Sequence, residues 1–277
     1  MGRWRILAVD LDGTLSSDGA TVNEAVRRSL REAEAAGVRV ILATGRPAAS
    51  AIAFARELEL RTPVICYQGA MICQPEDGSP LYERTMDIQV ALDALRWGRE
   101  HDRHLLLFAD GSMWVDRRLH PYEVYYRWMG LPIRIAPRLD DLVASGQVTH
   151  VYKLIDFLPR EEWGIPDRTS MWREVLDGPV CVVRSHEMFV ELMSPEATKG
   201  NALAWLAERW QIPRDQILAV GDSENDLSMI RWAGMGVAMG QAAPDVLAEA
   251  DWVAPPVEKD GVAWVVRRFI LNGASHG

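Results

Sequence analysis

The 277-residue sequence contains few cysteines. Only three are present, Cys66, Cys73 and Cys181. Their odd number argues against a framework of paired disulfides, and their spacing is not that of a metal-binding cluster. We therefore expect them to be reduced thiols, in or near the core of a protein from a reducing compartment.

The sequence also lacks an apolar run of membrane-spanning length, which takes about 20 residues. Residues 1–12 have a short apolar part that soon turns acidic, which does not resemble a signal peptide. Positive charge is scarce, because 30 Lys and Arg stand against 39 Asp and Glu, for a net charge of -9. Nucleic acids and anionic membranes bind a basic face, so we expect neither partner, and we expect a cytoplasmic protein.

No internal repeat or low-complexity segment is evident, and 48% of the residues are hydrophobic. A chain of this length and composition can bury a full core and is long for one compact domain. Short apolar runs rich in β-branched residues alternate with helical patterns such as residues 22–36. These runs are typical of strands buried on both faces of a parallel sheet covered by helices, and they are residues 6–9, 38–43, 63–67, 217–220, 235–239 and 251–254.

The pattern changes between residues 83 and 192. Helical segments at 87–101, 121–129 and 166–176 are interleaved with short strands at 105–109, 113–115, 150–155, 181–184 and 189–192. We interpret this stretch as an α/β cap domain, 83–192, inserted into a core made of residues 1–82 and 193–277. Such a cap would exclude water from a site at the strand ends.

Two carboxylates follow the first apolar run. Asp10 and Asp12, in the segment Asp-Leu-Asp-Gly-Thr, are two residues apart, and alternation along an extended chain sends both to one side. Gly13 allows a sharp turn behind them. Two close carboxylates repel each other, and a bound divalent cation makes such a pair tolerable. The alternative is that one Asp caps a turn and the other is solvated.

Three further motifs follow in a fixed order. Residues 42–47 (Leu-Ala-Thr-Gly-Arg-Pro) close the second apolar run, where a helix is expected to begin. Residues 194–200 (Ser-Pro-Glu-Ala-Thr-Lys-Gly) open an amphipathic stretch, and residues 221–226 (Gly-Asp-Ser-Glu-Asn-Asp) follow a later apolar run. Open parallel sheets bind ligands at the carboxyl ends of their strands, so one shared site is predicted.

With these four motifs, the sequence resembles the haloacid dehalogenase superfamily, specifically its Cof-type phosphatases with a large α/β cap. The resemblance implies a doubly wound, Rossmann-like parallel-sheet core, and residues 236–240 and 259–263 match the family's last core segments. Two amide substitutions depart from the family pattern. Gln68 and Gln241 stand where Asn is usual, which affects fine substrate contacts rather than the chemistry.

The resemblance implies roles for the acidic residues. Asp10 would be the nucleophile that accepts the phosphoryl group, and Asp12 would protonate the leaving alcohol and then deprotonate water. Mg²⁺ would be held by Asp10, the carbonyl of Asp12 and Asp222, with Asp226 accepting hydrogen bonds from metal-bound water. The alternative for Asp222 and Asp226 is an acidic helix N-terminus that is favourable to the helix dipole.

Substrate-binding residues follow from the same motifs. Thr44 and the amide of Gly45 are placed to donate to phosphate, the alternative for Thr44 being an ordinary N-cap. Arg46 either reaches substrate or pairs with an acidic neighbour, and Asn225 contacts substrate or Asp10. Lys199 is one of only three lysines beside 27 arginines, which hints that a compact charge is needed there; the alternative is a surface cation at a helix start.

In the expected cap, Tyr122, Tyr125, Tyr126 and Met129 form one helical face, which core packing explains better than substrate stacking. His186 and Glu187 lie on an expected hairpin loop that could reach the site.

We expect an Mg²⁺-dependent hydrolase of a small phosphorylated metabolite such as a sugar phosphate or phosphorylated cofactor. A phosphomutase of the same fold and a non-catalytic ligand-binding regulator are the alternatives. The substrate and the oligomeric state do not follow from the sequence.

Overall fold

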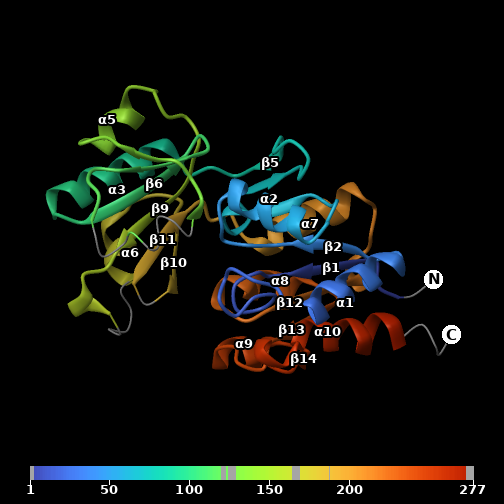
Figure 1. Ribbon diagram of the computed structural model, residues 1–277. Coiled ribbons are helices and arrows are strands. Elements are labelled where there is room, and N and C mark those ends of the chain that lie inside the picture. The colour runs from blue at the N-terminus through green and yellow to red at the C-terminus, as the bar shows by residue number, and fades with distance from the viewer. Residues whose placement is uncertain (1–2, 120–122, 124–128, 164–168, 187, 273–277) are drawn as a thin grey trace. The chain divides into compact units, whose positions relative to one another are not determined.

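The computed structural model describes residues 3–119, 123, 129–163, 169–186 and 188–272 (Figure 1). Contacts between residues divide the chain into two compact units. The first contains residues 1–45, 51–82 and 198–277, and the second contains residues 46–50 and 83–197. Among the described residues, no helix is both long and apolar enough to cross a membrane.

The first unit is built on a five-stranded sheet whose order is β14-β13-β12-β1-β2. All of its pairings are parallel. Every residue of β1 is buried, as a strand covered on both faces requires. The strands are β1 (Ile6–Val9), β2 (Arg39–Leu42), β12 (Ile217–Gly221), β13 (Met235–Ala238) and β14 (Trp252–Val253).

Helices cover this sheet, which gives the doubly wound α/β core that was predicted. On one face, Leu203 and Leu206 of α7 pack in a cluster with Ile6, Ala8 and Ile41 of the sheet, while α1 contacts β2 and α10. The helices are α1 (Glu24–Ala35), α2 (Ala48–Glu57), α7 (Lys199–Arg209), α8 (Leu227–Trp232), α9 (Pro244–Glu249) and α10 (Gly261–Val265), and the short helical segments are η1 (Tyr67–Gly69), η4 (Arg214–Gln216), η5 (Glu224–Asp226), η6 (Val257–Lys259) and η7 (Val266–Leu271).

Helix α1 shows how local sequence sets an element. The side chain of Asn23 accepts a hydrogen bond from the backbone N–H of Val26, which caps the helix start. Val26, Leu30 and Ala33 recur at helical spacing and are buried, and Gly37 follows with a φ of 85°. The predicted helix at residues 22–36 is therefore confirmed, two residues shorter at its start and one residue shorter at its end.

The apolar run at residues 63–67 is not a full strand of the parallel sheet. It forms β3 (Val64–Cys66), which pairs antiparallel with β4 (Met71–Cys73) in a small sheet that also contains β5 (Pro80–Glu83). An isolated parallel bridge between Ile65 and Ala43, with a hydrogen bond from the N–H of Thr44 to the carbonyl of Ile65 at 2.9 Å, joins it to the segment that follows β2. The chain reverses within a few residues, so β3 pairs antiparallel with its own neighbour along its length, and the expected parallel pairing is reduced to this one bridge.

The second unit contains a six-stranded sheet in the order β10-β11-β9-β6-β7-β8, antiparallel except for the β7–β8 pair. Its strands are β6 (His104–Ala109), β7 (Ser112–Val115), β8 (Ile133–Ile135), β9 (Val151–Phe157), β10 (Cys181–His186) and β11 (Phe189–Met193), and its helices are α3 (Ile88–Glu100), α5 (Leu139–Ala144) and α6 (Thr169–Val175), with the short turn η3 (Arg160–Glu162). The predicted helical face with Tyr122, Tyr125 and Tyr126 lies outside the described residues, as does Glu187.

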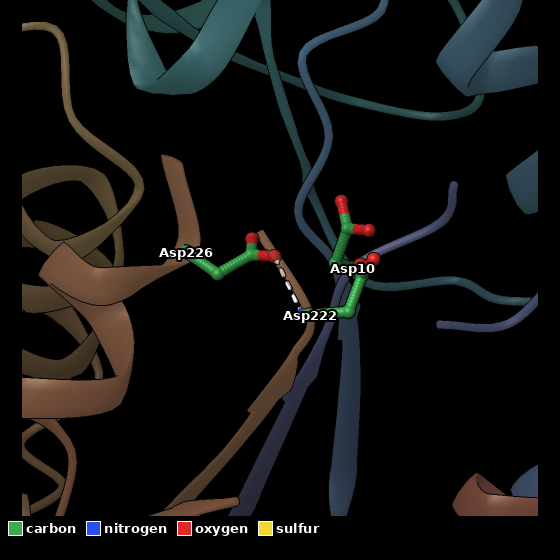
Figure 2. A group of neighbouring side chains, drawn as sticks. All are labelled: Asp10, Asp222 and Asp226. Atoms are coloured by element: carbon green, nitrogen blue, oxygen red, sulfur yellow. Dashed lines mark hydrogen bonds between the residues drawn. The ribbon is translucent and has the colours of Figure 1, made fainter. Parts of the chain in front are cut away.

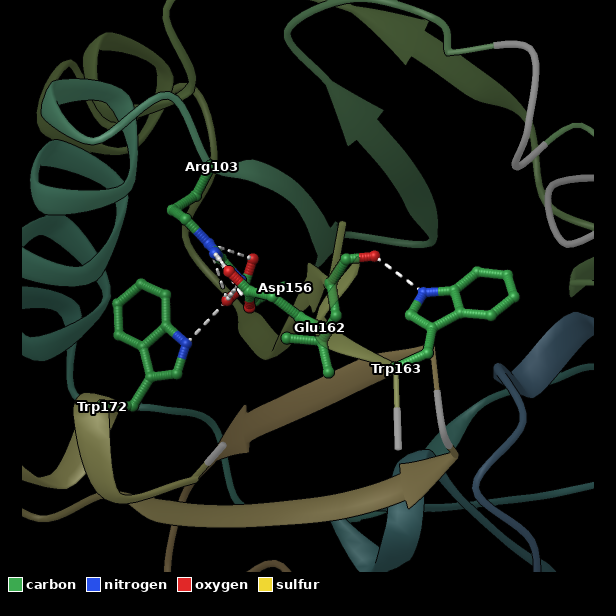
Figure 3. A network of polar contacts seen from close by, with 6 residues as sticks. Arg103, Asp156, Glu162, Trp163 and Trp172 are labelled. Atoms are coloured by element: carbon green, nitrogen blue, oxygen red, sulfur yellow. Dashed lines mark hydrogen bonds and ion pairs between the residues drawn. The ribbon is translucent and has the colours of Figure 1, made fainter. Parts of the chain in front are cut away.

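A buried polar network ties the second unit together (Figure 3). Asp156 of β9 is fully buried, and both of its oxygens accept hydrogen bonds from Arg103, at 2.8 to 3.2 Å. The indole N–H of Trp172 donates to the same carboxylate at 2.9 Å, and Arg103 also donates to Glu162. A buried charge needs such partners, and these bonds connect the sheet to α6 and η3.

The three cysteines are free thiols. Cys66 and Cys73 are buried on neighbouring strands, and their sulfur atoms are 3.9 Å apart. Cys181 is half-buried. Their positions agree with the predicted core and near-core placement.

Candidate active site

The site begins where two adjacent parallel strands end. Strand β1 pairs with β12 in register, Val9 opposite Val220, so Asp10 and Asp222 leave the same edge of the sheet. The backbone N–H of Asp10 donates to the carbonyl of Val220 at 3.0 Å, which extends the pairing by one residue. Carboxylates that are 212 positions apart in sequence are thereby brought together with Asp226 (Figure 2).

Lys199 is the positive group of this site. Its side chain is fully buried, and Nζ lies 2.5 Å from Oδ1 of Asp10 and 2.6 Å from Oδ1 of Asp226. Burial alone would lower its pKa, but the charges of Asp10 and Asp226 and their hydrogen bonds raise the pKa of Lys199 above the usual value, so it stays protonated. The alternative of a surface cation is therefore wrong.

The two strand-end carboxylates titrate abnormally. Burial, and then the charge of Asp226, raises the pKa of Asp10 well above its usual value, although Lys199 opposes this effect. Burial and the charge of Asp226 also raise the pKa of Asp222 to about 6. Three carboxylates so close together repel one another, and a cation among them would relieve that repulsion.

The donor set fits a hard divalent cation. Carboxylate oxygens of Asp10, Asp222 and Asp226 lie within 4.8 Å of one another, and oxygen is the ligand type that Mg²⁺ prefers. The three carboxylates differ in how many hydrogen bonds their oxygens accept, and so in which oxygens are open to a cation. Asp226 accepts from Lys199 at Oδ1 and from the backbone N–H groups of Asp222 and Ser223 at Oδ2, whereas Asp10 and Asp222 keep oxygens less occupied by hydrogen bonds.

Asp226 lies in the turn that follows Asp222. It does not share a helix with Asp222, because Asp222 lies between β12 and η5, and Asp226 ends η5. With Ser223 it forms a capping box at the start of that turn. Asp226 thus lies in a helical turn, as the alternative of an acidic helix N-terminus supposed, and it also accepts a hydrogen bond from Lys199.

The turn after Asp10 is fitted closely to Asp222. Gly13 has a φ of 86°, and a Cβ at this position would lie 2.3 Å from Oδ2 of Asp222, so a side chain is excluded. Thr14 donates from Oγ1 to Oδ1 of Asp222 at 3.0 Å. Thr14 was not among the predicted residues, although its place directly behind Gly13 was a usable signal.

Asp12 is half-buried and forms an isolated bridge with Ser16. Its carboxylate is not part of the Asp10, Asp222 and Asp226 cluster, which is compatible with the expected use of its carbonyl rather than its side chain as a ligand.

The second motif differs from its prediction in one respect. Helix α2 begins at Ala48, so Thr44 is not its N-cap, and Gly45 does not lie in its first turn. The physical reason is Pro47, which disfavours helical backbone at the residue before it. Thr44 and Arg46 are nevertheless buried. Arg46 Nη1 lies 3.5 Å from Ser50 Oγ.

Two glutamines, Gln68 and Gln241, form hydrogen bonds with residues of the motif segments. Asn225 donates from Nδ2 to Oε1 of Gln68 at 2.8 Å, and Gln241 donates from Nε2 to the carbonyl of Gly13 at 2.5 Å. Gln68 and Gln241 are the two positions where the family usually has Asn, and nothing in the sequence indicated which residues they would contact.

We expect Asp222→Asn to stabilise the metal-free protein at neutral pH. Because the pKa of Asp222 rises to about 6 on folding, the folded state binds more protons than the unfolded chain between about pH 4 and 6, and stability falls as pH rises through that range. The neutral amide avoids this loss, which amounts to roughly 3 kcal/mol or less at about pH 7.5. Denaturant unfolding of both proteins in EDTA measures this difference in the free energy of unfolding.

The gain should shrink toward pH 4, where Asp222 is protonated in the folded state. Asp245→Asn, at an exposed position of α9, is the matched control and should show no such pH dependence. A gain from Asp222→Asn that is equal at both pH values would contradict the prediction.

Known proteins resemble nearly the whole chain. The family model described as haloacid dehalogenase-like hydrolase matches residues 7–266. The Bacillus subtilis protein YxeH is 30% identical over 275 residues, covering 97% of this chain and 99% of YxeH. The 5-amino-6-(5-phospho-D-ribitylamino)uracil phosphatase YitU of the same organism is 24% identical over 269 residues, covering 95% of this chain and 97% of YitU.

A solved structure of a haloacid dehalogenase-like hydrolase from B. subtilis has a TM-score of 0.84 with 26% identity, and the match covers 96% of this chain and 100% of that one. The family match spans nearly every element of the core and of the second unit, including all four motifs. The chain therefore belongs to the haloacid dehalogenase-like hydrolases, as its motifs predicted.

Proposed function

We propose that this protein is an Mg²⁺-dependent phosphomonoester hydrolase that acts on a small phosphorylated metabolite through an aspartyl-phosphate. Its class, a phosphatase of this family, follows from the family match and from relatives that are named phosphatases. The observation that best supports the mechanism is the buried Asp10 carboxylate, at the end of β1 and hydrogen-bonded by Lys199.

In the first step, an oxygen of Asp10 attacks phosphorus, and the bond from phosphorus to the alcohol oxygen breaks. Asp12 gives its proton to the leaving alcohol, so a neutral alcohol departs and Asp10 carries the phosphoryl group. In the second step, water attacks phosphorus, Asp12 takes a proton from that water, and inorganic phosphate leaves Asp10 as a carboxylate.

The substrate is a dianion that approaches several carboxylates, so positive charge and hydrogen-bond donors must offset the repulsion. Mg²⁺ bound by Asp10, Asp222 and the carbonyl of Asp12 would supply part of that charge. Lys199 supplies another part at Oδ1 of Asp10 and leaves Oδ2 free to attack. Asp226 holds Lys199 and the backbone of residues 222 and 223 in place.

We assign phosphate binding to Thr44 and Gly45, with Arg46 and Asn225 as further substrate contacts. The role of residues 83–192 as a cap stays a prediction, as do the cytoplasmic location and the absence of a nucleic-acid partner. YitU acts on a phosphorylated ribitylaminouracil by its name, and a substrate of comparable size is proposed here.

The test is release of inorganic phosphate from an aryl phosphate, with Mg²⁺ and with EDTA. Release that requires Mg²⁺ supports the proposal, and no release under either condition would contradict it. Isomer formation from a hexose phosphate without net phosphate release would indicate a phosphomutase instead. A panel of phosphorylated metabolites then identifies the substrate by its kcat/KM.

We expect Asp12→Ala to lower kcat by about 10²- to 10⁴-fold, the usual contribution of general acid–base catalysis. The loss should persist with an aryl phosphate whose leaving group needs no protonation, because Asp12 also activates water in the second step. Steady-state rates with such a substrate measure it. A near-native rate would show that Asp12 is not needed to activate water.

A further inference from the structure

The short turn η1, residues 67–69, contacts three of the four motif segments. The backbone N–H of Gln68 donates to the carbonyl of Thr44 at 3.1 Å, and Asn225 donates to the side chain of Gln68 at 2.8 Å. Gly69 lies against the third motif, since a Cβ there would be 2.2 Å from the carbonyl oxygen of Thr198. The turn therefore lies where the phosphate-binding and acidic segments converge.

The backbone of this turn is unusual. Tyr67 and Gln68 have φ values of 50° and 60°, and neither is glycine. Consecutive residues in the left-handed region persist only where their surroundings impose that conformation, and they are commonest at functional sites. Both side chains are buried, so the turn is held by its packing rather than exposed to water.

The Gln68 side chain fills the space over Gly45. A Cβ at Gly45 would lie 2.3 Å from Nε2 and 2.7 Å from Cδ of Gln68, and its three nearest atoms all belong to Gln68. With Gln68 in this position, only glycine fits at position 45, because the Gln68 carboxamide packs where a side chain would begin. The Gln68 side chain therefore limits where the backbone of the Thr44–Gly45 segment can lie.

The carboxamide oxygen of Gln68, Oε1, accepts the hydrogen bond from Asn225. Oδ1 of Asn225 is buried and has no hydrogen-bond partner among the described residues. The bond from Nδ2 to Gln68 is thus the hydrogen bond that fixes this side chain, which stands between Asp222 and Asp226 in sequence. Buried polar atoms left without a partner are rare and point to a functional role.

We propose that Gln68 is a positioning residue: its carboxamide packs on Gly45 and accepts from Asn225, and so fixes the phosphate-binding segment relative to the acidic segment at residues 222–226. The inference rests on the proposed phosphatase function. Small displacements of groups that orient a reacting phosphoryl group are costly in rate, so this contact should matter although Gln68 takes no part in the chemistry.

The experiment is a double-mutant cycle of Gln68→Met and Asn225→Ala. Met keeps the length and most of the volume of Gln but cannot accept the hydrogen bond through an amide oxygen. Gln74→Met, in the loop that follows β4, is the matched control. Four quantities are measured for each protein: kcat, KM, the thermal midpoint, and the calorimetric Kd for inorganic phosphate with Mg²⁺ present.

We expect each single variant to lose roughly 10- to 100-fold in kcat/KM, the usual cost of removing an orienting partner. Because both changes break the same contact, the double variant should lose little more than the more impaired single one. Phosphate affinity should fall in the same non-additive way, while the thermal midpoint of Gln68→Met stays close to that of Gln74→Met.

Independent, multiplying losses would overturn the inference, as would a Gln68→Met protein that matches Gln74→Met in kcat/KM and phosphate affinity. If Gln68→Met does not fold, Gln68→Leu, which also lacks the acceptor oxygen, takes its place in the cycle. A wild-type protein without Mg²⁺-dependent phosphate release would instead overturn the proposed function, so the two failures are distinguishable.

Discussion

The Asp10→Asn protein is expected to release phosphate on the order of 10⁴- to 10⁶-fold more slowly than the wild type, the range seen when one residue of a protease catalytic triad is removed. The amide that replaces the carboxylate cannot attack phosphorus to form the covalent intermediate. Single-turnover and steady-state phosphate release with Mg²⁺ present measure the effect.

The variant should remain folded, which separates loss of chemistry from loss of structure. Burial and the neighbouring carboxylates disfavour the charged form of Asp10, so a neutral Asn relieves repulsion, while Lys199 keeps its bond to Asp226. The thermal midpoint in EDTA should therefore not fall. Asp245→Asn is the control for the substitution itself, and wild-type turnover by Asp10→Asn would rule out the covalent route.

The Lys199→Arg protein is expected to lose about 10²-fold or more in kcat/KM, although its charge is unchanged. The Lys199 side chain is fully buried, and its ammonium lies between two carboxylate oxygens at 2.5 and 2.6 Å. A planar guanidinium is larger and directs its donors in a fixed fork, so it would displace Asp10 from the line of attack.

Lys259→Arg is the matched control, because Lys259 is exposed and should tolerate arginine with near-native kcat/KM. Overpacking at position 199 should also cost about 1–3 kcal/mol of stability, which denaturant unfolding detects separately from the kinetic effect. Similar, near-native kcat/KM values for both variants would contradict the role assigned to Lys199.

Much of the core and part of the site were predictable because their signals are local. The run at residues 6–9 predicts a buried strand, and parallel strands end at one edge of a sheet, so Asp10 and Asp222 could be expected to meet. Gly13 indicated the sharp turn in the same way. Lys199 was indicated by a compositional contrast, since it is one of three lysines beside 27 arginines.

Other features depended on contacts between distant segments. The run at residues 63–67 carries the signal of a parallel strand, but it pairs mainly with the strand that follows it and keeps a single parallel bridge to Ala43, because pairing is decided by geometry rather than by composition. Pro47 delays the start of α2, which removes Thr44 from the capping position that its sequence suggested. Neither outcome is encoded in the periodicity of one segment.

By itself, the sequence determined which residues stand at strand ends and which chemical groups they carry, because alternation, glycine turns and apolar runs act within a few residues. Only the tertiary structure decided that Asp226 binds Lys199 and its own turn, and that Gln68 joins Gly45 to Asn225. The physical reason is that hydrogen bonds and close packing act over about 3 to 4 Å, and folding alone sets such distances between residues far apart in the chain.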